Sequence, residues 1–499
     1  MKQKRILSAI LAALMLTAPL ASCANDTDPQ APQDTQAPQQ TAADTEADTE
    51  LKDELPDDLD YGNDEIILIS RDIGMNLADE IYVESLNSDP VNDAIYERNK
   101  FVENRLGVKI TSIRDTDTIV DKVITSVNGG SADYDIMVEY CWLAAPKTIE
   151  GYFANLRGTE EQYIDFEKPW WTQSFNDVVS YHDRQYGITG AMVLSTYRRT
   201  YTTVFNKKLF TDANQPYLYD HVENGTWTLD KQAALVPLLH RDNGNGVQDE
   251  EGDVYGFVSN DFISVDPYWA ACEIDILSKN EDGDYTWIFD SGVMHNAAEK
   301  ILNLFFNTDG GTFCFPEDDS FQTMTRTMFA EGYAAMATLC IHALENSALR
   351  NMTDEYGVVP MPKYDEKQTD YHSQMHDAFT IACIPTTVKG DRLEQMAAFL
   401  EAMASASYRI VRPDYYETTL RTKIAQDPQS SEMMDIIINN IHIDAGIIYS
   451  HNIGSFHQGI QALVEGKTNN AVSRFKSMSK SAQNSLTKLI RKLNQLEQQ

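Results

Sequence analysis

Alternating strand and helix patterns between residues 65 and 140 constrain the fold of this 499-residue chain more than any other feature. Glu65–Ser70, Val108–Ile113 and Tyr134–Tyr140 have the β-branched or apolar composition of strands. Val91–Leu106 and Thr118–Val127 have apolar residues near helical spacing, and glycines follow both segments. The order strand, helix, strand, helix, strand predicts a parallel sheet with right-handed crossovers. We therefore expect an α/β fold.

The end of the third predicted strand is the first candidate binding site. Ligands of such sheets collect beyond the carboxyl ends of the strands. That rule places Glu139, Tyr140 and Trp142 at the edge of a cleft. For Trp142, packing in the core is an equally good interpretation, because a large aromatic side chain is usually buried.

Length and charge narrow the class of protein. More residues follow position 60 than one hydrophobic core usually organises, so two lobes are expected. The chain has 76 acidic and 40 basic residues, a formal net charge of −36. This charge repels phosphate backbones, so nucleic acid is not an expected partner. A neutral or cationic solute is easier to accommodate.

The N-terminus has the pattern of a bacterial lipoprotein signal. Lys2, Lys4 and Arg5 precede an apolar run, Ile6–Leu16, that is too short to span a bilayer. Leu-Ala-Ser-Cys then ends at Cys23, which reads as a lipobox. We expect residues 1–22 to be removed and a lipid on Cys23 to anchor the protein to the outer face of the cell membrane. The alternative is an ordinary signal peptide followed by a chance cysteine.

Residues 23–60 are expected to form a disordered acidic linker. They are rich in Asp, Glu, Thr, Gln, Ala and Pro and contain no aromatic residue. The five cysteines that follow are an odd number without a CxxC pair, so they are expected to be free thiols. No HExxH, GxSxG or P-loop motif occurs, and we expect neither catalysis nor a cofactor.

Several short motifs occur in the order found in one family. They are Ala94–Asn99 (AIYERN), Tyr134–Ile136 (YDI), Phe205–Phe210 (FNKKLF), Gly225–Thr228 (GTWT), Phe329–Met336 (FAEGYAAM), Tyr356–Pro362 (YGVVPMP) and Arg412–Tyr416 (RPDYY). With the lipobox and the acidic linker, this order resembles the extracellular solute-binding lipoproteins of sugar ABC importers, of the clostridial type. Each motif is weak by itself, and the resemblance rests on their order.

The resemblance implies a two-lobed, type II periplasmic-binding-protein fold. One lobe would contain residues 61–193 and 371–405, and the other residues 194–370 and 406–499. The chain would cross between the lobes near Val193–Tyr201 and return near Lys363–Met375. A C-terminal helix would present Phe475, Leu486, Leu489, Ile490 and Leu493 as its apolar residues.

The same resemblance implies a function. The protein would bind a carbohydrate, an oligosaccharide in particular, between its lobes and deliver it to an ABC permease as a monomer. A surface-anchored glycan hydrolase and a non-catalytic interaction lipoprotein remain as alternatives. A ligand panel that records both thermal stability and product formation separates the three.

Further binding residues are expected where the resemblance places the cleft. Tyr197 and Arg198 lie at the first crossing, and His376 and Asp377 at the return crossing; structural pairing is the alternative for Arg198 and for the His-Asp pair. His342 follows the FAEGYAAM motif. Tyr268 and Trp269 lie in a loop-like segment after Asp-Pro and are a second candidate aromatic plate, with a loop wedge as the alternative.

Other motifs are read as structural. Trp170, Trp171 and Trp227 are expected in the core, with Thr228 as a helix N-cap. The Arg241–Asp253 segment is similar to a calcium loop but has Arg241 and Gly252 at two positions that need oxygen ligands. A polar turn without metal is therefore expected there.

Overall fold

A computed structural model describes residues 51–72, 77–116, 118–247, 252–289, 292–316, 319, 322–425 and 427–496. The signal peptide, Cys23 and most of the acidic linker lie outside the described residues. Residues 51–60, expected within the disordered linker, instead lie against the body of the protein. Leu55 is buried, and Arg105 donates hydrogen bonds of 3.0 Å to the backbone carbonyls of Leu55 and Pro56.

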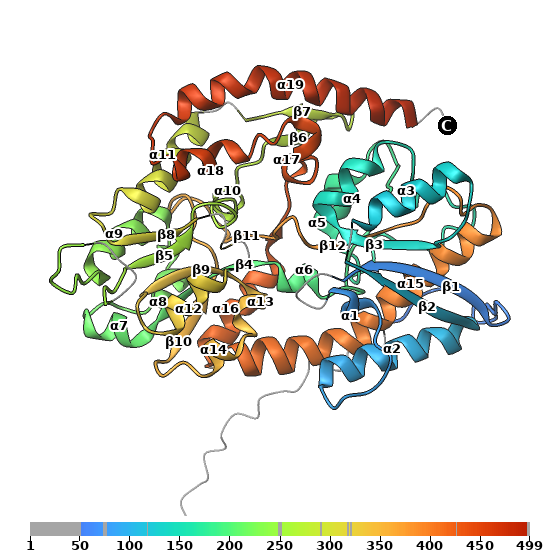
Figure 1. The fold of residues 1–499 in the computed structure, drawn as a ribbon, viewed down its shortest axis with the longest axis horizontal. Helices are drawn as coiled ribbons and strands as arrows, with labels where there is room; N and C mark the ends of the chain where they lie inside the picture. The colour runs from blue at the N-terminus through green and yellow to red at the C-terminus, as the bar shows by residue number, and fades with distance from the viewer. Residues whose placement is uncertain are drawn as a thin grey trace, which may run out of the picture. The chain divides into compact units, whose positions relative to one another are not determined.

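The first lobe is built on a four-stranded sheet in the order β12-β3-β1-β2 (Figure 1). β1 (Asp64–Arg71), β2 (Val108–Asp115) and β3 (Ile136–Tyr140) are parallel, as the sequence predicts, and β12 (Thr380–Cys383) is antiparallel to β3. Two helices connect the parallel strands, α2 (Pro90–Leu106) and α3 (Ile119–Gly129). They cover opposite faces of the sheet. Shorter helices of this lobe are α1 (Leu77–Ile81), α4 (Cys141–Thr148) and α5 (Gln173–Val179).

The second lobe is built on a five-stranded sheet in the order β10-β4-β9-β5-β8. Its strands are β4 (Tyr201–Asn206), β5 (Phe257–Asn260), β8 (Thr312–Phe315), β9 (Met336–Cys340) and β10 (Tyr356–Val359). Around them are α7 (Lys207–Asp212), α8 (Leu218–Glu223), α9 (Leu229–Leu239), α10 (Pro267–Ala271), α11 (Gly292–Phe306), α12 (Thr323–Ala330), α13 (Ile341–Leu344) and α14 (Ser347–Arg350). A hairpin of β6 (Leu277–Lys279) and β7 (Tyr285–Trp287) extends this lobe.

Three segments connect the two sheets. The first runs through α6 (Ser195–Arg198) into β4, and the second returns from β10 to β12. These two segments touch: Thr200 and Met375 form an antiparallel bridge, and the backbone N–H of His376 donates to the carbonyl of Arg199 at 2.9 Å. The third segment is the long helix α15 (Asp391–Pro413), which continues as π-helical turns over Asp414–Ile424 into α16 (Pro428–Asn439). The helix is unbroken at Ser405, where the expected lobe boundary falls.

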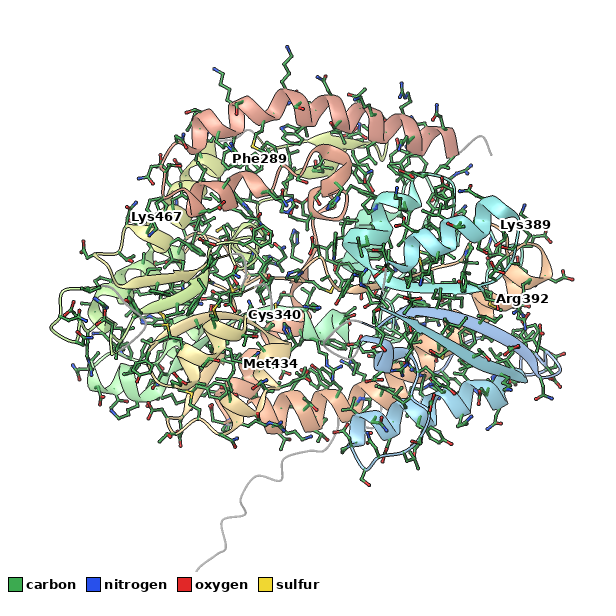
Figure 2. All side chains as sticks on the ribbon, in the orientation of Figure 1. Phe289, Cys340, Lys389, Arg392, Met434 and Lys467 are labelled. Atoms are coloured by element: carbon green, nitrogen blue, oxygen red, sulfur yellow. The ribbon has the colours of Figure 1, made fainter. Side chains whose placement is uncertain are left out.

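The C-terminal segment completes the described chain. β11 (Ser373–Gln374) pairs with β13 (Ile441–His442), and α17 (Ala445–Ile448), the 3₁₀ turn Ser450–Ile453, α18 (Gln458–Glu465) and α19 (Ala471–Leu496) follow. The expected C-terminal helix is therefore present. Its buried side chains include Phe475, Leu486 and Leu489, and Phe289 lies beneath it (Figure 2).

The aromatic residues read as structural are in the core. Trp170, Trp171 and Trp227 are buried, and the hydroxyl of Thr228 accepts a hydrogen bond from the N–H of Lys231 at the start of α9. The five described cysteines are free thiols; Cys141, Cys272, Cys340 and Cys383 are buried and Cys314 is half-buried. Within the described residues, every helix is too short or too polar to cross a bilayer.

Candidate functional site

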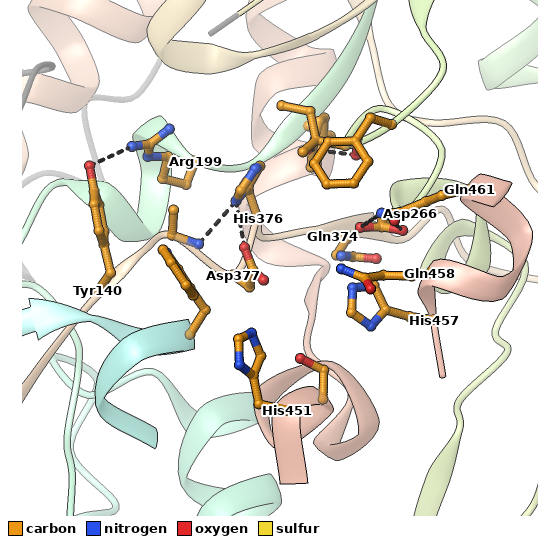
Figure 3. A pocket seen from close by; sticks show the side chains of 16 residues that line it. Tyr140, Arg199, Asp266, Gln374, His376, Asp377, His451, His457, Gln458 and Gln461 are labelled. Atoms are coloured by element: carbon orange, nitrogen blue, oxygen red, sulfur yellow. Dashed lines mark hydrogen bonds and ion pairs between the residues drawn. The ribbon is translucent and has the colours of Figure 1, made fainter. Parts of the chain in front are cut away.

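A cavity of about 330 Å³ lies where the two crossing segments meet (Figure 3). Both lobes, both crossing segments and the C-terminal segment contribute to its lining. The volume is at the lower end of the roughly 300 to 1,000 Å³ found for small-molecule sites. Because several separate stretches of chain surround it, the cavity is a suitable place for a solute that the lobes enclose.

The first lobe contributes an aromatic wall. Tyr140 is the last residue of β3, and Trp142 is in the first turn of α4, so the carboxyl end of the strand delivers both rings to the cavity. The Trp142 ring is half-buried and lies 5.7 Å from the ring of His451. The Arg199 guanidinium donates to the Tyr140 hydroxyl at 3.3 Å. An aromatic plate of this kind fits the C–H face of a sugar ring.

The crossing segments contribute the polar floor. His376 stacks on Tyr201 with ring centroids 5.8 Å apart, and its Nδ1 lies 2.9 Å from Oδ1 of Asp377. Burial by itself would raise the pKa of the Asp377 carboxyl. The hydrogen bond to His376 and the positive charges of His376, His457 and Arg199 together outweigh burial, and the pKa is lowered. Asp377 is therefore ionised at neutral pH and can accept hydrogen bonds from a ligand.

The second lobe and the C-terminal segment form the opposite wall. Asp266, just before α10, accepts hydrogen bonds from Nε2 of Gln461 at 2.9 Å to each carboxylate oxygen. His457 and Gln461 come from the start and the middle of α18, and both are buried. Burial, with the charge of Asp377, holds the pKa of the Asp266 carboxyl well above its usual value. Burial also lowers the pKa of His457 to about 4, so this ring is neutral at pH 7.

Three of the nine ligand-binding candidates from the sequence line this cavity: Tyr140, Trp142 and Asp377. Glu139 precedes Tyr140 on β3 but does not line the cavity. Because successive side chains of a strand point to opposite faces, Glu139 turns inward, where it is buried 3.4 Å from Arg71.

Tyr197 and Arg198 also lie away from the cavity. The Arg198 guanidinium lies 3.2 Å from a carboxylate oxygen of Glu80 and 3.0 Å from one of Glu345, which is the structural pairing weighed as the alternative. The Tyr197 ring stacks on Tyr415 at 6.1 Å.

The remaining candidates are held inside the second lobe. Pro267–Ala271 is the helix α10 rather than a loop, and it buries Tyr268 and Trp269 completely in the core. The Tyr268 hydroxyl is 2.9 Å from that of Thr338, and the Trp269 ring contacts Phe289 edge-on at 5.3 Å. His342 is 3.3 Å from the carbonyl of Arg198 through Nδ1, and it does not line the cavity.

Sequence reasoning missed most of the second wall. Neither Asp266 nor Arg199 is among the binding residues expected from the sequence. The local sequence does not mark His451, His457 and Gln461 as site residues. They join the site only through the fold, because they lie about 190 residues from Asp266 in the chain. A signal that the sequence does offer is the clustering of two His and two Gln residues between His451 and Gln461.

No group of metal-ligating side chains occurs among the residues that the structure describes. In the calcium-like segment, side-chain oxygens of Asp242, Asn243 and Asn245 accept hydrogen bonds from backbone N–H groups two residues further on. Gln248–Glu251 of that segment lie outside the described residues.

No protein-family model matches the sequence, and no curated protein matches it. Solved structures do resemble the fold. The galacto-N-biose-/lacto-N-biose I-binding protein of an ABC transporter from Bifidobacterium longum, in complex with lacto-N-biose, has a TM-score of 0.57 at 12% identity, covering 86% of this chain and 98% of its own. An ABC substrate-binding protein from Listeria monocytogenes in complex with cycloalternan has a TM-score of 0.52 at 16% identity, covering 86% and 99%.

A solute-binding protein from Thermotoga lettingae bound with α-D-tagatose is similar to the same extent, with a TM-score of 0.51 at 16% identity, covering 86% of this chain and 100% of its own. The fold of this chain is therefore the two-lobed α/β fold of ABC-transporter solute-binding proteins. Its own residues at the cavity, rather than that likeness, must identify what it binds.

Proposed function

We propose that this protein is a solute-binding protein that captures a carbohydrate between its lobes for import by an ABC permease. One observation carries the proposal: the cavity combines the half-buried Trp142 plate with hydrogen-bonding side chains from both lobes. Sugars need this combination because they present C–H faces and hydroxyl rims. The ligands of the similar structures, cycloalternan, lacto-N-biose and tagatose, support this choice of solute class.

The crossing segments suggest how capture works. Residues of these segments line the cavity and also connect the lobes, so a solute there contacts the hinge as well as both walls. A solute that makes more contacts when the lobes are closed shifts the protein toward the closed arrangement. The permease would then recognise the closed form, and the solute would leave chemically unchanged.

The N-terminal pattern completes the proposal. Residues 1–22 would direct export, a lipid on Cys23 would hold the protein at the outer face of the membrane, and the acidic segment up to residue 50 would act as a spacer. The working unit would be a monomer, with residues 61–193 and 371–405 in one lobe and residues 194–370 and 406–499 in the other. Labelling of growing cells with a fatty acid checks the anchor: label on the protein should disappear in Cys23→Ser.

A glycan panel tests the function. Carbohydrate ligands should raise the Tm without forming products, because binding to the native state alone adds about 2.7 kcal/mol of stability at a ligand concentration of 100 Kd. Trp142→Ala should weaken binding about tenfold, as expected for the loss of an aromatic contact worth about 1.4 kcal/mol. Asp282→Asn, on the exposed turn between β6 and β7, is the matched control. Release of shorter sugars would instead favour a glycan hydrolase.

A further inference from the structure

The wall formed by Asp266, His457 and Gln461 has unfilled hydrogen-bonding capacity. The amide nitrogen of Gln461 faces Asp266 and donates to both of its carboxylate oxygens. In this orientation Oε1 of Gln461 is buried without a hydrogen-bond partner among the described residues. Nδ1 of His457 is also buried and unpartnered among the described residues. Because both residues line the cavity, a ligand there can supply the missing hydrogen bonds.

The charges around the cavity are not balanced either. Asp266 and Asp377 both line it, and Arg199 is its single Lys or Arg. Arg199 lies against Tyr140, on the far side of the cavity from Asp266 (Figure 3), and Asp377 has His376 as its partner. Within the described part of the chain, no basic side chain forms an ion pair with Asp266, and its carboxylate accepts hydrogen bonds from the neutral Gln461. A shielded carboxylate without a cation is costly.

A ligand can satisfy both requirements with one group. An ammonium has a positive charge and three N–H donors but no acceptor. It matches a wall with a carboxylate, an acceptor-only amide oxygen and a neutral imidazole nitrogen. A sugar hydroxyl would offer Asp266 one neutral hydrogen bond. An ammonium would instead stabilise the ionised carboxylate through a charge-assisted hydrogen bond, which is about twice as strong as a neutral one.

We infer that the Asp266–His457–Gln461 wall binds an amino group, so the preferred solute is an amino sugar in its ammonium form. The inference rests on the proposed function and makes it more specific. The sugar ring would lie toward Trp142, and its ammonium would point toward Asp266. The strongly acidic character of the whole chain, with a formal net charge of −36, favours the approach of such a cation.

Matched ligands test the inference. Glucosamine and its β-1,4-linked disaccharide are compared by calorimetry with their N-acetylated counterparts, which lack the charge, and with glucose and cellobiose. The amino form should bind at least about tenfold more tightly than either neutral counterpart. Asp266→Asn, which keeps the shape of the side chain, should remove this preference and change the affinity for the neutral sugars much less. Asp282→Asn should leave the preference intact.

The outcomes separate the two proposals. If a neutral sugar binds as tightly as its amino counterpart, the inference is overturned and carbohydrate capture stands. If no member of the panel binds, both are overturned. The comparison of ligands on the unmodified protein decides between these outcomes even if Asp266→Asn fails to fold.

Discussion

At the scale of single residues, Glu401 is a carboxylate outside the cavity whose burial affects the stability of the protein. It lies in the middle of α15 and is almost completely buried. Its side chain accepts a hydrogen bond from Nε1–H of Trp171 at 3.1 Å. Burial raises the pKa of Glu401 from 4.5 to about 8. The folded protein therefore keeps a proton on Glu401 at pH values where the unfolded chain has lost it.

This difference predicts a pH-dependent stability. Between about pH 4.5 and pH 8 the folded state binds more protons at Glu401 than the unfolded state, so the free energy of unfolding should fall as pH rises. Glu401→Gln cannot ionise, so its stability relative to the unmodified protein should increase from pH 5 to pH 8. Urea unfolding at these two pH values measures the difference, and the exposed Glu281→Gln is the control. Parallel pH profiles for the protein and Glu401→Gln would contradict the assignment.

Two adjacent arginines show what the sequence could not determine about the site. Arg198 and Arg199 both lie at the first crossing, but only Arg199 lines the cavity. Arg198 is held by Glu80 and Glu345, which are about 120 and 150 residues away in the chain. Since the choice between the two depends on these distant carboxylates, the local sequence predicts a basic residue near the cleft but not which of the pair it is.

At the scale of secondary-structure elements, α2 shows how local chemistry fixes helix boundaries. Asp89 is its N-cap and accepts hydrogen bonds from the N–H groups of Val91 and Asn92 at 3.1 and 3.0 Å, and Pro90 is the first helical residue. Gly107 ends the helix with φ of 59°, and a Cβ there would lie 2.0 Å from Oδ1 of Asp60. The sequence therefore predicts both ends closely: Gly107 directly follows the predicted range Val91–Leu106, and Asp89 lies two residues before it.

Removal of the N-cap should have a measurable effect. Asp89→Ala leaves two N–H groups of α2 without acceptors and should lower the free energy of unfolding by about 1 kcal/mol. Asp89→Asn retains an acceptor oxygen and should lower the free energy of unfolding much less. Equilibrium denaturation with urea measures both. Equal losses for the two variants would show that the charge, rather than the cap hydrogen bonds, stabilises the helix end.

Elements with strong periodicity were predictable, and those defined by tertiary contacts were not. β1, β2 and β3 lie within two residues of their predicted ranges, because β1 and β3 contain apolar runs and the first residues of β2 alternate between apolar and polar. The sequence predicts a loop where α10 lies, because a five-residue helix is too short to show a period. The same holds for the four-residue 3₁₀ turn that contains His451.

At the scale of the whole chain, α19 connects the two lobes. Phe475, near its start, packs edge-on against Trp269 and Phe289 of the second lobe at 6.0 and 4.7 Å. Its far end contacts the first lobe: the Arg184 guanidinium donates to the carbonyl of Leu496 at 2.7 Å, and the Tyr181 hydroxyl to Oδ1 of Asn494 at 2.9 Å. We therefore expect these bonds to break when the lobes move apart.

Loss of the Arg184 contact should favour the open form. Arg184→Ala removes a charge-assisted hydrogen bond worth about 1.5 to 3 kcal/mol, which is expected to be absent from the open form. The radius of gyration of the solute-free protein, measured by small-angle X-ray scattering, should increase. Solute affinity should fall about tenfold, because binding must then supply the free energy of closure. Lys480→Ala, on the exposed face of α19, is the control and should change neither quantity. If Arg184→Ala also leaves both unchanged, α19 does not influence closure.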